Sequence, residues 1–123
     1  MNDTLKVMIK LWKVDKVDWM GYESDERYSY HHLHKKSDGG KTTLENGAVL
    51  HQSTHSYLHT IEHYDYDKYI QLNTILKAIN KQRTMPTIEQ LKEIQSVLKE
   101  FQNEYDGKVT SREKPIIKKE YRI

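Results

Sequence analysis

The chain has 123 residues, of which 36% are hydrophobic and 31% are charged, and its formal net charge is +2. This length fits a single domain over residues 1–123, and the mildly basic charge permits a polyanionic partner without requiring one. The absence of cysteine excludes disulfides, thiol nucleophiles and cysteine-based zinc sites, and no apolar run approaches the roughly 18 residues of a membrane span. We therefore expect a cytoplasmic protein that does not associate with membranes.

Residues 1–27 are expected to form an N-terminal helix followed by a loop. A helix over 4–13 is predicted because its apolar residues recur at the spacing of one helix face. These residues are Leu5, Met8, Ile9 and Trp12. Residues 15–27 contain Gly21 and several acidic side chains, which favours a connecting loop.

Residues 28–64 are expected to form two strands and a helix. The stretch 28–33 is rich in aromatic residues and alternates, which predicts a strand, and residues 48–52 predict a second strand. Between them Gly39-Gly40 marks the tightest point of a loop. Asn46-Gly47 is the strongest two-residue hairpin signal, so a pure turn role is one interpretation of these two residues.

Three helices are predicted after the second strand. Ser53 is the expected N-cap of the first, whose apolar face begins with Leu58 and Ile61. Over 65–106 we expect two further helices, one from Asp67 to Asn80 and one over 87–105. The last of these starts with a capping box, Thr87-Ile88-Glu89-Gln90, and carries a regular apolar stripe that suits a core or a homodimer face. Residues 107–123 form a predicted basic tail.

All seven histidines lie between positions 31 and 63. His55 and His59 are four residues apart on the predicted helix and therefore share one face, where they could bind one metal ion. A third ligand must come from elsewhere, and the first strand offers His31 and His32. Because neighbouring side chains of a strand point to opposite sides, only one of these two should face the ion, which leaves the other to accept a proton from water.

The remaining histidines and the acidic residue nearest the pair have simpler interpretations. His34, His51 and His63 are expected to be ordinary surface residues. Glu62 lies on the same helix face as the histidine pair and could orient a liganding histidine, but a solvated helix carboxylate is the preferred interpretation.

The arrangement His31-His32, Gly39-Gly40, Asn46 and His55-Ser-Tyr-Leu-His59 resembles the His-Asn-His motif of the HNH endonuclease family. The likeness is to the ββα-metal branch of that family, which includes the colicin nucleases, and it spans about a quarter of the chain. It implies an α+β fold: a ββα-metal hairpin-plus-helix core with additional flanking α-helices.

The resemblance also implies a role for each matched residue. His32 would be the general base that activates water, and His31, His55 and His59 would hold a single divalent metal ion. Asn46 would fix the loop and orient His32 by hydrogen bonding. Three imidazoles favour Zn, Mn, Ni or Co over Mg, although members of the family vary in the metal they use. The implied function is a metal-dependent endonuclease that hydrolyses phosphodiester bonds in DNA.

The chain departs from the family in two respects. It lacks the cysteine pairs that bind a structural zinc in many relatives, and the arginine often found near the scissile phosphate has no clear counterpart. Arg27, Lys35, Lys36 and Lys41 are all positioned to replace that arginine. The alternative function is a binding or regulatory protein on the same fold, for example a phage nuclease inhibitor. A zinc peptidase is excluded because Ser56 stands where such enzymes carry a catalytic glutamate.

Overall fold

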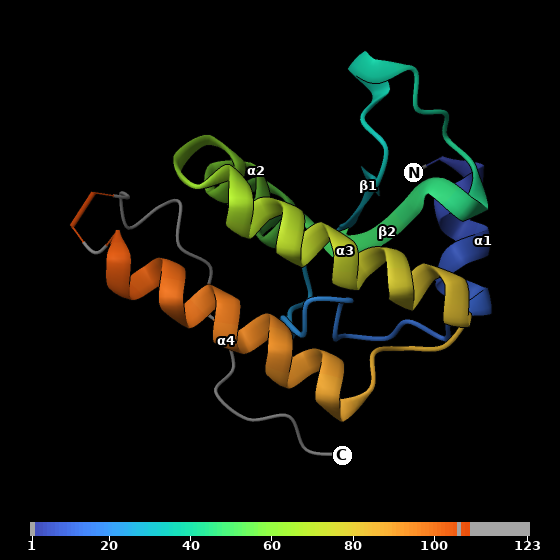
Figure 1. Ribbon diagram of the computed structural model, residues 1–123. Helices are drawn as coiled ribbons and strands as arrows, with labels where there is room; N and C mark the ends of the chain where they lie inside the picture. The colour runs from blue at the N-terminus through green and yellow to red at the C-terminus, as the bar shows by residue number, and fades with distance from the viewer. Residues whose placement is uncertain (1, 106, 109–123) are drawn as a thin grey trace.

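The computed structural model describes residues 2–105 and 107–108, and over these residues the chain has an α+β fold with a two-stranded antiparallel sheet (Figure 1). The helices and strands are α1 (Asp3–Leu11), β1 (Tyr28–His32), β2 (Gly47–His51), α2 (Gln52–Tyr64), α3 (Tyr66–Gln82) and α4 (Ile88–Glu104). Two 3₁₀ turns, η1 (Lys36–Asp38) and η2 (Leu44–Asn46), lie between the strands. The predicted basic tail lies outside the described residues from position 109 onward.

The two strands pair over their full length, with Tyr28 opposite His51 and His32 opposite Gly47. Residues 33–46 join them, and the part around η1 projects away from the helices, whereas η2 lies against α1 and α3 (Figure 1). The interpretation of Asn46-Gly47 as a two-residue turn is therefore wrong, because Gly47 has extended backbone angles and begins β2. Glycine is needed there for a different reason: a Cβ would lie 2.3 Å from the Tyr30 ring.

The connection between the strands is tightest at Gly39-Gly40, as expected. Gly39 has φ +92°, a conformation that other residues rarely adopt. Gly40 donates a backbone hydrogen bond to the Lys35 carbonyl at 2.8 Å, and a Cβ on it would lie 1.9 Å from the His34 carbonyl oxygen. The two glycines thus hold the chain beside the end of β1.

The start of α2 differs from the prediction. Strand β2 passes directly into the helix, so the N-cap position belongs to His51, and the prediction of Ser53 as N-cap is wrong. Carboxylates from the loop over 15–27 cap the helix instead. Glu26 accepts hydrogen bonds from the Ser53 amide at 2.9 Å and its hydroxyl at 2.7 Å, while Asp18 accepts from the His51 amide at 2.9 Å. Negative charge at a helix N-terminus complements the helix dipole and satisfies free N–H groups.

His51 is not a surface residue, which corrects the second expectation for this region. Its side chain has 0% exposure and stacks on the Tyr28 ring at 4.5 Å. Its two ring nitrogens hydrogen-bond to the carbonyl oxygens of Glu26 at 3.1 Å and Lys16 at 2.7 Å. Burial was missed because the loop that covers the ring lies 25 to 35 residues earlier in the chain. His34 and His63 are exposed, as expected.

One continuous core joins α1, the hairpin and the other three helices. The apolar face of α2, including Tyr57, Leu58 and Ile61, is buried, and α3 lies against this helix. The apolar stripe of α4 is buried within the same chain, and its capping box between Thr87 and Gln90 is confirmed. A homodimer through this helix stays a prediction. None of the helices in the described residues is long and apolar enough to cross a membrane.

Candidate metal centre

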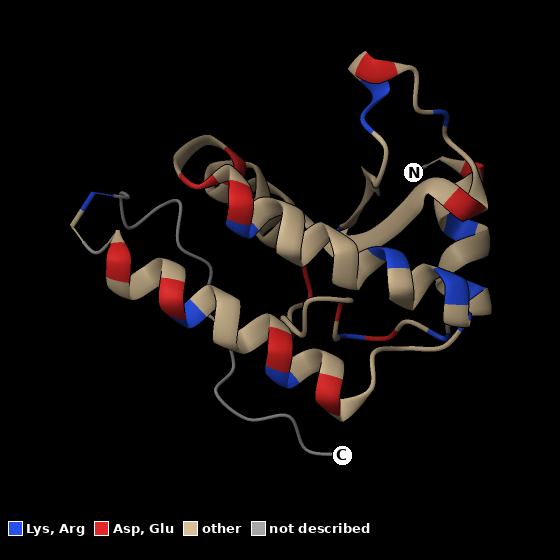
Figure 2. Ribbon diagram, viewed as in Figure 1, with Lys and Arg blue, Asp and Glu red and all other residues tan. Residues whose placement is uncertain are grey.

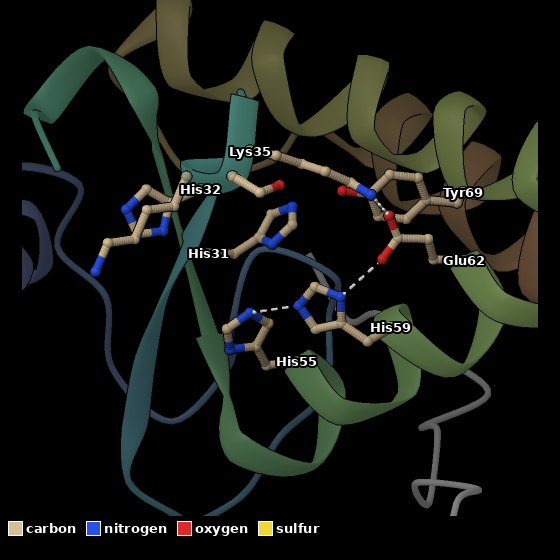
Figure 3. A pocket seen from close by; sticks show the side chains of 9 residues that line it. His31, His32, Lys35, His55, His59, Glu62 and Tyr69 are labelled. Atoms are coloured by element: carbon tan, nitrogen blue, oxygen red, sulfur yellow. Dashed lines mark hydrogen bonds and ion pairs between the residues drawn. The ribbon is translucent and has the colours of Figure 1, made fainter. Parts of the chain in front are cut away.

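Three of the predicted site residues come together between β1 and α2. The ring nitrogens that His31, His55 and His59 offer all lie within 4.8 Å of one another. Figure 3 shows the two α2 side chains projecting toward His31. The i, i+4 spacing on α2 and the position of His31 on the strand that faces this helix account for the convergence. His31 is buried, His55 is half-buried and His59 is exposed.

His32 takes the other direction of the strand, as expected from the alternation of side chains. Its ring packs edge-on against Tyr30 at 4.7 Å, and its Nε2 lies 3.0 Å from the Thr42 hydroxyl. It still lines the same pocket as the three clustered histidines, an open cavity of about 360 Å³. The pocket therefore contains three grouped imidazoles and a fourth that is held apart from them.

The protonated nitrogen of His59 is assigned by its partner. Its Nδ1 lies 3.0 Å from a Glu62 carboxylate oxygen, which can only accept, so Nδ1 carries the proton. The Nε2 lone pair of a neutral ring then points toward the other two histidines.

His55 is oriented in the same way by Ser29. Its Nδ1 lies 2.8 Å from the Ser29 hydroxyl oxygen, and that hydroxyl donates to the Leu50 carbonyl at 3.3 Å. The serine hydroxyl thereby fixes the orientation of the ring, and the Nε2 atom of His55 is directed toward His59.

His31 is oriented by Asn73 of α3. Its Nε2 lies 2.8 Å from the Asn73 amide oxygen, and the amide nitrogen of Asn73 donates to the Leu33 carbonyl at 2.9 Å. That second bond fixes the amide orientation, so His31 donates through Nε2 and leaves Nδ1 unprotonated. All three rings thereby direct one nitrogen toward a shared centre, and hydrogen-bond partners of this kind orient histidines at metal sites.

The closest pair of these nitrogens is separated by 3.1 Å, between His55 Nε2 and His59 Nε2. This is a hydrogen-bonding distance, so one of the two nitrogens carries a proton that a bound metal ion would displace. Two nitrogen ligands of a tetrahedral zinc ion, each at 2.0–2.1 Å, are about 3.3 Å apart. The donor set therefore fits a divalent metal ion that accepts imidazole ligands.

Burial favours the neutral form of His31 and His55. It lowers the pKa of His31 to about 4 and that of His55 to about 4, and in each case neighbouring histidines lower it further. Burial also lowers the pKa of His32, with a smaller contribution from Lys36. Neutral imidazole is both the form that binds metals and the form that accepts a proton.

Glu62 is not the solvated carboxylate that was preferred from the sequence, because its side chain is only 17% exposed. One of its oxygens pairs with His59 and the other with Lys35 (Figure 3). Burial would raise the pKa of Glu62, but the hydrogen bonds from Lys35 and His59 outweigh it and hold the pKa below its ordinary value. Among the four basic candidates for the missing arginine, Lys35 and Lys36 line the pocket.

Asn46 fixes the connection between the strands. Its side chain accepts from the His34 amide at 2.7 Å and donates to the carbonyls of His34 at 3.1 Å and Lys41 at 2.8 Å. Within residues 2–105, no hydrogen bond joins it to His32, whose ring is bonded to Thr42 instead. Its contacts thus place it outside the pocket, where it holds the backbone that follows His32.

Two residues that orient the histidines were missed from the sequence: Ser29 and Asn73. A serine in a strand carries no distinguishing signal. Asn73 did have one, because it lies with Asn80 on the otherwise apolar face of α3, seven residues apart. Asn80 donates to the carbonyls of Leu44 at 2.7 Å and Gly47 at 2.8 Å, so both amides attach α3 to the hairpin. Buried amides on an apolar stripe need such partners.

No family model, no curated protein and no solved structure matches this chain. The functional interpretation accordingly depends on the chemistry of the site: three oriented imidazoles, a fourth imidazole in the same pocket, and one carboxylate paired with a lysine.

Proposed function

We propose that the protein is a metal-dependent endonuclease that hydrolyses phosphodiester bonds in DNA. His31, His55 and His59 would hold one divalent metal ion, with Zn, Mn, Ni or Co preferred over Mg for a set of imidazoles. The observation that carries this proposal is the convergence of three imidazole rings, each oriented by its own partner, in a pocket that also contains His32. The likeness of these positions to the His-Asn-His motif supports the choice of reaction.

The metal ion, when bound, would supply a Lewis acid that stabilises the negative charge developing on the phosphate. The protein's own residues would position the metal ligands. Each of the three ligand rings would be oriented by one partner, namely Ser29, Asn73 or Glu62. This arrangement would lower the cost of assembling the site when the ion arrives.

His32 would act as the general base. Its lowered pKa keeps the ring neutral near pH 7, and the contact between Nε2 and Thr42 leaves Nδ1 to accept a proton from the attacking water. The side chain lies apart from the three clustered histidines, so it would remain free for this task while they bind the ion. Asn46 would act indirectly, by holding the backbone of the adjoining connection.

Cleavage assays with defined ions test the proposal. Protein treated with EDTA is supplied with Mn, Zn, Ni, Co or Mg and incubated with plasmid DNA. We expect His32→Ala to lower the cleavage rate by about 10²–10⁴-fold while metal affinity is kept. His63→Ala is the matched control, because His63 is an exposed histidine of α2 that does not line the pocket.

Two outcomes would contradict the proposal. One is that no ion supports cleavage, and the other is that cleavage persists unchanged in His32→Ala. A stoichiometric protein partner recovered with a protein that cleaves nothing would favour the regulatory alternative on the same fold.

A further inference from the structure

Lys35 differs from most lysines at a protein surface because its ammonium group is held in place. It follows β1 at the pocket wall and forms an ion pair with Glu62 of α2. The same ammonium lies 5.8 Å from the centroids of both the Tyr66 and Tyr69 rings. A lysine side chain normally loses considerable rotamer freedom when it binds a ligand, and these contacts restrict that freedom in advance.

Lys36 provides the internal comparison. It lines the same pocket, but it is exposed and forms no ion pair with a described residue. Lys35 directly precedes η1 and Lys36 is its first residue, and Figure 2 shows this basic stretch at the projecting end of the connection. Of the two, only Lys35 has a fixed position relative to the histidines.

Glu62 links Lys35 to the metal centre. Its two carboxylate oxygens hold different groups: one accepts from Nδ1–H of His59, and the other holds the ammonium of Lys35. It is also the one acidic side chain among the described residues that line the pocket. Because Lys35 balances its charge, Glu62 can orient a metal ligand without giving the pocket a net negative wall that would repel phosphate.

An ammonium group has three N–H donors. If one of them stays with Glu62, two remain for the non-bridging oxygens of a phosphate. We propose that Lys35 is the phosphate-binding cation of this pocket and that Glu62 is the positioning residue that places both Lys35 and His59. The inference rests on the proposed function for the identity of that phosphate as part of a DNA backbone.

Binding of a fluorescent DNA duplex to EDTA-treated protein tests this inference without any cleavage. We expect Lys35→Met to weaken binding about tenfold and to reduce the slope of log affinity against log salt concentration by about 0.9, the value for one lost phosphate contact. Lys35→Arg should retain most of the affinity, and Lys36→Met should lose less than Lys35→Met. The control is Lys92→Met, an exposed lysine of α4 that does not line the pocket.

A double-mutant cycle tests the role of Glu62. In a Glu62→Gln background Lys35 is no longer held, so we expect Lys35→Met to lose about twofold in affinity instead of about tenfold. Cobalt titrations followed by absorption should show metal affinity lowered about 10–100-fold in Glu62→Gln and unchanged in Lys35→Met. Circular dichroism melts establish that each variant is folded.

Several results would overturn the inference. They are an unchanged affinity and salt slope in Lys35→Met, equal losses in Lys35→Met and Lys36→Met, equal losses with and without Glu62, and a native protein that binds no duplex. These results are independent of the cleavage assay. If the native protein cleaves nothing but Lys35→Met loses duplex binding, the nuclease proposal is refuted and the role of Lys35 stands. If the native protein cleaves DNA but Lys35→Met binds the duplex unchanged, only the role of Lys35 is refuted.

Discussion

The hairpin and α2 carry both the three histidines of the candidate metal centre and the buried His51. The ring nitrogens of these two groups have different partners. His31, His55 and His59 each have one nitrogen bonded to a protein group and the other directed toward a shared centre. His51 has both nitrogens bonded to backbone carbonyls of the loop over 15–27. Both nitrogens of His51 are therefore already engaged by the protein.

This difference distinguishes a histidine that can bind a metal ion from a histidine that stabilises the fold. A histidine with no nitrogen left over ties two segments together and has nothing to offer an ion. A histidine that directs one nitrogen into a shared pocket keeps a ligand atom that it can offer to an ion. The two kinds should therefore respond in opposite ways to mutation, one through stability and the other through metal binding.

The largest effect is expected at His51. His51→Ala removes a fully buried ring and the hydrogen-bonding partner of two carbonyl oxygens, so we expect the free energy of unfolding to fall by about 3 kcal/mol or more. Urea unfolding of EDTA-treated protein measures this loss. His63→Ala serves as the control and should change stability by less than about 0.5 kcal/mol. If His51→Ala were as stable as the control, the scaffold role would be wrong.

His55→Ala should show the opposite pattern. Metal-free stability should change by less than about 1 kcal/mol, because the His55 ring is only half-buried. Native protein at 100 times the metal dissociation constant should gain about 2.7 kcal/mol of stability, and His55→Ala should gain almost none. Thermal melts with and without zinc measure both quantities. A metal-independent loss as large as that of His51→Ala would erase the distinction between the two kinds of histidine.

The carboxylate cap on α2 tests whether the loop over 15–27 contributes to stability alone. Glu26→Gln removes a carboxylate that accepts two hydrogen bonds from Ser53 at the helix N-terminus. We expect a loss of about 1 kcal/mol in the free energy of unfolding, with no change in metal affinity. Urea unfolding and metal titration of the same variant check the two halves of this prediction, and a weakened metal site would show that the loop also supports the pocket.

Ser29→Ala tests the ligand side with the smallest expected effect on stability. It removes the hydroxyl that lies 2.8 Å from Nδ1 of His55, so the ring loses the partner that orients it. We expect metal affinity to fall about tenfold, the lower end of the usual effect of such partners, with stability changed by less than about 0.5 kcal/mol. Isothermal titration calorimetry with zinc provides the measurement. An unchanged affinity would mean that packing alone orients His55.

Regular spacing made most elements predictable. The apolar repeat predicted a helix over 4–13 where α1 spans Asp3–Leu11, and the capping box located the start of α4. The same kind of spacing placed His55 and His59 on one face of α2. Two predictions failed because they depended on parts of the chain beyond the local pattern. Ser53 is not the N-cap of α2, because Glu26 binds its hydroxyl and caps the helix from the preceding loop. Asn46-Gly47 is not a two-residue turn, because the strands are joined by the longer connection over 33–46.

The sequence alone identified the histidines that could supply ligand atoms to the candidate site. It could do so because the faces of a helix and the alternation of a strand are properties of the local backbone. Only the tertiary structure decided how those donors are used. Which nitrogen of each ring is free depends on Ser29, Asn73 and Glu62, and the pairing of Lys35 with Glu62 joins two elements across the pocket. Hydrogen bonds between such segments act over about 3 Å, so they exist only once the chain has packed.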